Sequence, residues 1–204
     1  MHLSTSQAAA QLEVSARQVR RSAASGRIVA TKLGTAHAFS SRQVQALERT
    51  AHRGRDWTDA VQKAALDLLA TGKTTELSSS ERSRLKHRIR ASDVGTLAGQ
   101  ILNGRVSLRR AASSYTKESF RSSMLLVSEL GLSSDGGLSV LIAEDASSAA
   151  RRAHLGLDDS GDIAVVEGED VHRGVLEVLA LYTYGDAREC AAAARWISAV
   201  QERM

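Results

Sequence analysis

The sequence has no proline, a single cysteine and few aromatic residues, which make up 3% of its 204 residues. Without proline, proline isomerisation cannot be a slow step in folding. The lone Cys190 excludes an intrachain disulfide and a cysteine-based zinc site, and its alanine-rich surroundings predict a buried apolar residue. With so few aromatics, the core must be built from Leu, Val, Ile and Ala, which suits closely packed helices.

Long apolar runs and the usual catalytic motifs are also missing. No segment approaches the length of a membrane span, and the N-terminus does not resemble a signal peptide, so we expect a soluble, cytoplasmic protein that does not contact a membrane. The sequence has no phosphate-binding glycine loop, no nucleophile elbow and no metal-ligand spacing, and its histidines form no i, i+4 pair. We therefore expect neither an enzyme nor a bound cofactor.

Two acidic stretches resemble metal sites only in composition. Residues 158–162 lack the spacing and the terminal glutamate of a calcium loop, so an acidic turn is predicted. Glu167, Glu169 and Asp170 could bind a metal, but carboxylates at the start of a helix also favour its dipole, and we prefer that interpretation.

The stretch from Leu3 to Leu47 repeats one helix-start signal three times. The pairs Ser4/Gln7, Ser15/Gln18 and Ser40/Gln43 each have the spacing of a capping box, in which serine and glutamine satisfy each other's backbone donors. Three short helices are therefore predicted. Only Glu13 and Val14 separate the first two, which suits a helix-turn-helix with a shared apolar seam of Ala9, Leu12, Val14, Val19 and Ala23.

A short hairpin is predicted after the second helix. Gly26 can end that helix in the left-handed conformation, and residues 27–33 then alternate toward a turn at Gly34 and Thr35 and a return strand ending at Phe39. Such a hairpin is typical of the wing of a winged helix-turn-helix. Because Val19 and Ala23 take the inward face of the second helix, its exposed face carries Arg17, Gln18, Arg20 and Arg21.

Positive charge is concentrated in this region. Residues 1–55 contain nine Lys/Arg against Glu13 and Glu48, an excess of seven in a chain whose formal net charge is +4. Phosphate backbones bind such patches through counterion release, and arginine can also grip the acceptor edge of guanine. Double-stranded DNA is therefore the predicted partner.

The same stretch resembles the small winged helix-turn-helix of excisionase and MerR-type proteins. The resemblance is carried by Leu3, Ser4, Gln7, Ala8, Ala9, Leu12, Val14, Ser15, Arg17, Val19, Arg21, Gly26, Arg27 and Ile28. It implies that Arg17, Gln18, Arg20 and Arg21 face the major groove, preceded by the cap Ser15, and that Arg27, Lys32 and Thr35 face phosphates or the minor groove. Gln18 cannot read an adenine while it closes a capping box, so its base contact is the weakest of these assignments.

A polar, basic segment from Arg49 to Asp56 marks the predicted boundary between residues 1–52 and 53–204, with a further boundary near 104–111. Beyond it, hydrophobic periodicity predicts further elements. The expected helices are 57–71, 80–92, 93–102, 117–130, 146–155, 171–182 and 187–203, and the expected strands are 106–110, 138–142 and 163–166. Trp196 is predicted to anchor the final helical hairpin in the core.

Charge divides this second part of the chain. Residues 82–110 contain eight Lys/Arg against Asp93 alone, and this surface could touch flanking phosphates, dock on an acidic partner or simply be solvated. Its possible phosphate contacts, with those of the linker, are Arg53, Arg55, Arg84 and Arg88. From residue 111 onward, eight Lys/Arg stand against fifteen Asp/Glu, so this half is not expected to face DNA.

The whole arrangement resembles AbiEi-type antitoxins, which are paired with nucleotidyltransferase-like toxins. The resemblance rests on the segments LSTSQAAAQLEVSARQV, GRDWTDAVQKAALDLLATG and SRLKHRIR, on the turn at Gly104-Arg105-Val106, and on the ending VLEVLALYTYGDARECAAAARWI. It implies an antitoxin that represses its own operon and counteracts such a toxin. Dimerisation is expected, because one short reading helix covers few base pairs.

Other functions stay open at this point. A stand-alone transcriptional regulator needs only the DNA-binding part, and an excisionase-like factor is usually little more than the winged module. A ligand-sensing repressor would need a sizeable apolar cavity, which the aromatic-poor second half does not predict. The predicted fold is mainly α with small β elements: a winged helix-turn-helix followed by an α+β domain for partner binding or self-association.

Overall fold

The computed structural model describes residues 2–25, 28–34, 36–51 and 54–204, and the chain is a mixed α/β protein in which helices outweigh strands. None of its described helices is long and apolar enough to cross a membrane. The N-terminal part consists of β1 (His2–Ser4), α1 (Thr5–Gln11), α2 (Ala16–Ala24), β2 (Thr31–Leu33), β3 (Ala36–Ser40) and α3 (Ser41–Arg49).

The N-terminal part has its own small core. Strands β1, β3 and β2 form an antiparallel sheet in that order, which pairs Leu3 with Phe39 and Lys32 with His37. Phe39 is fully buried, and around it pack side chains from the sheet and from all three helices. The strand β1 lies before the first helix start and has no sequence signal of its own, so it was not predicted.

Two of the three predicted capping boxes form, and the third does not. Ser4 with Gln7 and Ser15 with Gln18 make both reciprocal hydrogen bonds. Ser40, by contrast, is the last residue of β3, and its Oγ is buried without a partner among the described residues. The Gln43 amide turns instead to Val29, where it donates to the carbonyl and accepts from the N–H at 3.0 Å each. The predicted Ser40/Gln43 box is therefore wrong.

The same amide explains why the predicted strand over residues 27–33 is shorter than expected. Because the Gln43 side chain satisfies the backbone of Val29, only Thr31–Leu33 pairs with β3 among the described residues of that range. Val14 also differs from expectation, since its side chain is 37% exposed and does not join the buried seam of Ala9 and Val19. The predicted cap Gly26 lies outside the described residues.

The larger, C-terminal part combines seven α-helices, one 3-10 turn and four strands among its described residues. They are α4 (Asp59–Thr71), α5 (Ser79–Ala91), α6 (Val94–Ile101), β4 (Val106–Arg110), α7 (Ser114–Ser122), β5 (Ser139–Ala143), α8 (Ala146–Arg152), β6 (Gly156–Leu157), β7 (Ile163–Glu167), η1 (Asp170–His172), α9 (Arg173–Tyr184) and α10 (Ala187–Arg203).

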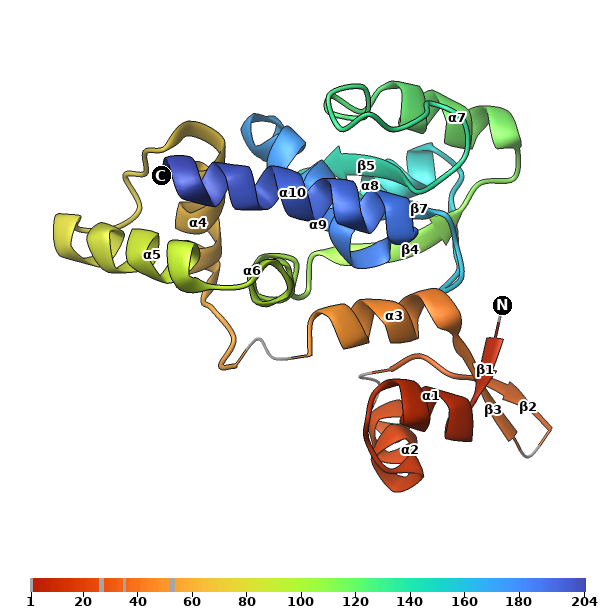
Figure 1. Ribbon diagram of the computed structural model, residues 1–204. Coiled ribbons are helices and arrows are strands. Elements are labelled where there is room, and N and C mark those ends of the chain that lie inside the picture. Colours follow the sequence, from red (N-terminus) through yellow and green to blue (C-terminus); the bar gives the residue numbers. More distant parts are fainter. Residues whose placement is uncertain (1, 26–27, 35, 52–53) are drawn as a thin grey trace.

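A four-stranded sheet and the helix α9 are the centre of this part (Figure 1). The strand order is β5-β7-β4-β6, with β5 and β7 parallel and β4 antiparallel to its neighbours. Alternate residues of β7 face opposite ways: Ala164 and Val166 join the cluster around α9, whereas Ile163 and Val165 pack under α8. Helix α9 is buried on nearly all sides, because α3, α4, α6, α10 and the sheet contact it.

The predicted helix over 117–130 is wrong in extent. Helix α7 ends at Ser122, because the backbone beyond it bonds to groups far away in sequence. The Leu125 N–H donates to Glu177 Oε2 at 2.8 Å, and the Arg121 guanidinium binds the carbonyls of Ser133 and Leu138. These bonds hold residues 123–138 in a non-helical course. The other predicted helices and strands of this part are present, and none of their ends is shifted by more than three residues.

Helix α3 joins the two parts (Figure 1). Its Val44 lies in the N-terminal core, whereas its Arg49 Nη1 donates to the carbonyls of Tyr182, Thr183 and Gly185 at 3.0, 3.0 and 2.8 Å. A Cβ on Gly95 of α6 would lie 2.1 Å from the Arg49 carbonyl oxygen, so only glycine permits this approach. No observation tests the predicted boundary at residue 52, which stays a prediction.

A buried ion pair ties α7 to the start of α10. Arg121 Nη1 lies 2.7 Å from Glu189 Oε1, and both side chains are 3% exposed. Glu189 also accepts from the N–H groups of Leu138 and Asp186, which completes the capping box of α10. The ion pair itself and the Leu138 bond therefore connect elements distant in sequence.

We expect Arg121→Met to lower the free energy of unfolding by about 3–5 kcal/mol, because it leaves the Glu189 carboxylate buried without its counter-charge. Urea unfolding followed by circular dichroism measures the change. Arg195→Met, which removes an exposed arginine of α10, is the matched control and is expected to stay within about 0.5 kcal/mol of the unaltered chain. Equal stabilities of the two variants would contradict this role of the pair.

Candidate nucleic-acid interface

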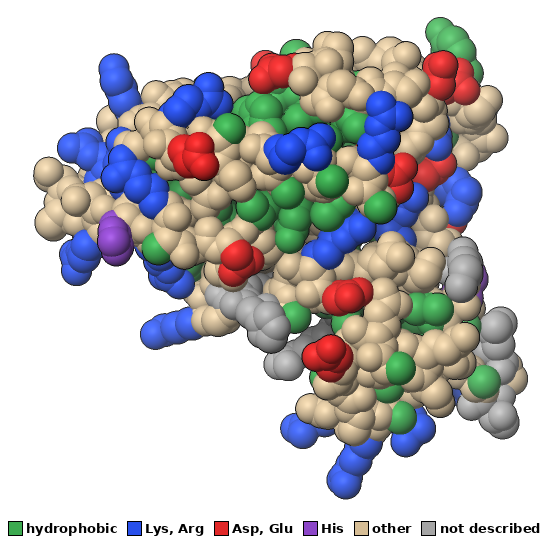
Figure 2. Space-filling view, viewed as in Figure 1, with side chains coloured by type: hydrophobic (Ala, Val, Ile, Leu, Met, Phe, Trp, Pro, Cys, Tyr) green, Lys and Arg blue, Asp and Glu red, His purple; other side chains and the backbone are tan. Residues whose placement is uncertain are grey.

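Helix α2 presents three arginines to solvent on one face. Arg17, Arg20 and Arg21 are exposed and stand at i, i+3 and i+4, whereas Val19, on the opposite side, is 1% exposed and packs in the N-terminal core. In Figure 2 basic side chains project from the lower end of the molecule, where Figure 1 places α2. The packing of Val19 thus fixes the direction in which the arginines point.

The charges of these arginines are not neutralised within the chain. Among the described residues, none of the three forms an ion pair with a carboxylate, and the first turn of α2 has no acidic residue. The positive end of the helix dipole adds to the same field. The face is therefore open to an external anion.

Arg42 and Arg49, by contrast, are used inside the molecule. Arg42 Nη1 donates to the Gly161 carbonyl at 2.8 Å, and its burial lowers the pKa of the guanidinium, which nearby Asp162 opposes. Arg49 caps the end of α9. Both contribute to the basic excess of residues 1–55, yet neither faces outward, so the sequence overstates the charge available to a ligand.

Ser15 and Gln18 hold the start of α2 in place. Gln18 Oε1 accepts from the Ser15 N–H and from the Ser15 hydroxyl, each at 2.9 Å, and the Gln18 N–H donates to Ser15 Oγ at 3.2 Å. An adenine contact needs that same Oε1 as an acceptor. In this conformation Gln18 therefore positions the helix and does not read a base.

The β2–β3 hairpin brings one further basic residue to the surface. Lys32 of β2 is exposed, and Gly34 takes a φ of +62° at the turn. Arg27, Thr35 and Arg53, which the sequence also predicted to contact DNA, lie outside the described residues.

A second basic surface lies on α5. A capping box of Ser78 and Glu81, which the sequence analysis overlooked although its S-x-x-E spacing is visible, starts this helix. Leu85 and Ile89 are buried, while Arg84 and Arg88 are exposed. Basic side chains crowd the end of the molecule where α5 lies (Figure 2).

Two contacts shape this surface. The Arg88 guanidinium lies 5.0 Å from the ring centre of Trp57, a cation–π arrangement that anchors it. Arg55 is exposed, and its main-chain carbonyl accepts from the Gln100 amide at 2.8 Å. Two other arginines of the predicted patch are bound within the fold: Arg105 donates to Gln62, and Arg110 pairs with Asp158 although its side chain is 53% exposed.

The acidic segment 158–162 is a turn, as predicted. Asp158 Oδ1 accepts from the Ser160 N–H and hydroxyl, and the Arg110 guanidinium and these Ser160 bonds lower the pKa of Asp158 to about 2. Within the described ranges, no group of three or more His, Cys, Asp or Glu side chains could hold a metal ion. Glu169 instead pairs with Lys63 at 3.2 Å.

Comparison of the chain with protein-family models, with curated proteins and with solved structures gives no match. The interpretation of this surface therefore rests on its own geometry and charge.

Loss of the α2 cap has a measurable cost. We expect Ser15→Ala to lower the free energy of unfolding by about 0.5–2 kcal/mol, because the first turn of α2 loses its side-chain acceptor. Gln18→Glu is expected to keep the stability of the unaltered chain, since glutamate closes the same box. Urea unfolding compares both with Ser83→Ala, an exposed serine inside α5. Equal losses in Ser15→Ala and Ser83→Ala would contradict the capping role.

Proposed function

We propose that this protein is a DNA-binding regulator whose residues 1–52 form a winged helix-turn-helix. In this proposal α1 and α2 are the two helices of the motif, Glu13, at a φ of +54°, forms the turn between them, and the β2–β3 hairpin is the wing. Helix α2 enters the major groove, and Arg17, Arg20 and Arg21 contact base edges and phosphates there.

The observation that carries this proposal is the unpaired arginine face of α2. An exposed arginine is usually no more than solvated, but three on one face of a short helix, with no carboxylate partner in the described part of the chain, form a surface that a polyanion neutralises. Lys32 lies on the adjoining hairpin, where a wing reaches the neighbouring groove or backbone.

The second basic surface supports a longer contact with DNA. Arg84 and Arg88 on α5, together with Arg55 before α4, are assigned to phosphates that flank the site read by α2. Phosphate contacts orient a protein on the duplex without reading sequence. Two copies of the chain on paired half-sites would increase discrimination, so a homodimer on DNA is part of the proposal.

The role of the remaining chain is proposed from the resemblance to AbiEi-type antitoxins. On this proposal, the regulator represses its own operon and residues 53–204 counteract a nucleotidyltransferase-like toxin. The acidic balance of residues 111–204 supports this in one respect, because it suits a basic protein surface better than nucleic acid.

DNA recognition is tested by selecting duplexes from a random library and titrating the selected sequence. We expect Arg17→Ala and Arg21→Ala each to lower affinity for it by about 1–3 kcal/mol while binding to unselected duplex falls less. Arg84→Ala is the comparison. It should weaken binding to the selected and the unselected duplex equally, and it should reduce the salt dependence of binding by about one counterion. Unchanged titrations for Arg17→Ala and Arg21→Ala would eliminate α2 as the reading helix.

The antitoxin role is tested by co-expressing the full chain with the product of the neighbouring gene. We expect the double variant Arg17→Ala/Arg21→Ala to rescue growth and co-purify with that product as the unaltered chain does, yet to lose repression of a reporter driven by the operon promoter. Absence of both toxicity and a complex would leave a stand-alone regulator.

A further inference from the structure

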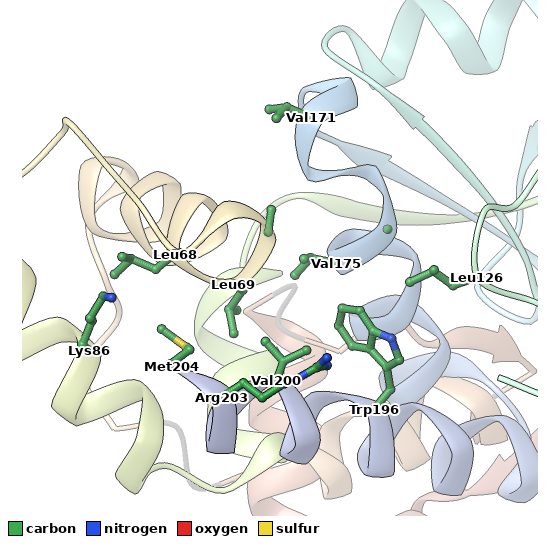
Figure 3. A pocket seen from close by; sticks show the side chains of 13 residues that line it. Leu68, Leu69, Lys86, Leu126, Val171, Val175, Trp196, Val200, Arg203 and Met204 are labelled. Carbon is green, nitrogen blue, oxygen red and sulfur yellow. The ribbon is translucent and has the colours of Figure 1, made fainter. Parts of the chain in front are cut away.

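Some apolar side chains reach the surface of the larger part because they belong to its core. Figure 3 shows one such place, an open groove between α4, α9 and α10 in which Leu69, Val175 and Val200 converge. Leu69 and Val175 are core residues, and Val200 packs against the same cluster. Their exposed edges are therefore accounted for by packing within the chain.

Val14 is an apolar side chain of a different kind. It is 37% exposed and belongs to none of the core clusters of the described residues. A single exposed valine is ordinary on a protein surface, so its position decides whether it has a role. Val14 lies directly before Ser15, the N-cap of α2, and so stands at the tip of the proposed reading helix.

The turn between α1 and α2 fixes the backbone of Val14. Glu13 has a positive φ, the Val14 N–H donates to the Ala9 carbonyl at 3.0 Å, and the Glu13 N–H donates to the Ala10 carbonyl at 3.3 Å. These two bonds are those of a Schellman motif, in which the residue at the Val14 position commonly packs on the residue at the Ala9 position. Such packing covers only part of Val14, so the motif holds an exposed apolar group at the start of α2.

Few other groups at this tip are free to meet a base. The Ser15 hydroxyl donates to Gln18 Oε1, and Ala16 packs against the N-terminal core. Arg17 is exposed and forms no ion pair with a described carboxylate. The first turn of α2 therefore offers the major groove one apolar group, one guanidinium and the amide nitrogen of Gln18.

From this arrangement we infer that Val14 reads a thymine by contact with its 5-methyl group. Among the standard base pairs, only those of adenine with thymine place a methyl group in the major groove, and an apolar side chain recognises it there. The residues at the N-terminus of a reading helix are the ones that reach base edges. The inference rests on the proposed function, and it adds a preference for thymine to the arginine contacts of α2.

The test compares thymine with 2′-deoxyuridine, which pairs with adenine in the same way and lacks only the methyl group. Each thymine of the selected duplex is replaced singly, and the unaltered chain is titrated with every product. We expect replacement at one position of the half-site to weaken binding about fourfold, which is the scale expected for the burial of one methyl group.

Val14→Ala locates the methyl contact. At the sensitive position this variant should bind the thymine and deoxyuridine duplexes with equal affinity, whereas Val171→Ala, which alters an exposed valine of the larger part, should keep the fourfold ratio. Each ratio compares two duplexes bound by one protein sample, so a change in the amount of folded protein cancels. Binding to unselected duplex shows that the variant is folded.

The outcomes separate this inference from the proposed function. A site with no sensitive thymine, or a ratio that Val14→Ala leaves unchanged, would overturn the inference, while a loss of affinity in Arg17→Ala would still support α2 as the reading helix. Unchanged titrations for both Arg17→Ala and Arg21→Ala would overturn the two together.

Discussion

The end of helix α9 is the point on which the two parts of this structure depend. The last carbonyls of a helix have no donors within it, and here they lie where the chain is packed, so they need donors from elsewhere. Arg49 supplies one guanidinium nitrogen to three of them, while the Gly185 N–H serves the Leu181 carbonyl. Because Arg49 sits at the end of α3, the helix that completes the N-terminal core also completes the C-terminal one.

Elements defined by local chemistry were predictable from the sequence. The Ser4/Gln7 and Ser15/Gln18 boxes and the left-handed cap at Gly72, with a φ of +74°, involve residues within a few positions of each other, and all three form. The predictions are wrong where a group distant in sequence forms a hydrogen bond that was expected to be local. The Gln43 amide bonds to the Val29 backbone and not to Ser40. The Leu125 N–H donates to Glu177 and not to a carbonyl of the predicted helix. Such competition leaves no signal within a short stretch of sequence.

The candidate site shows the same division. The helical period and the buried neighbour Val19 predict that Arg17, Arg20 and Arg21 point outward. All three are exposed in the structure. The inward direction of Arg42 could not be foreseen, since its acceptor, the Gly161 carbonyl, is 119 residues away.

Charge is distributed in a way that would orient the protein on a polyanion. Exposed arginines that form no ion pair among the described residues lie on α2 and α5, whereas the acidic excess lies beyond residue 110, where several carboxylates are already engaged by arginines within the fold. Exposed charges act only within about 8 Å at physiological ionic strength, so a duplex attracted to α2 would feel the acidic half weakly unless it approached that side directly. On the proposed function, the attraction would be local to the basic helices, and the acidic surface would remain accessible to a second partner while DNA is bound. A regulator that must hold DNA and a protein at the same time needs this separation, because one shared basic surface would force the two ligands to compete.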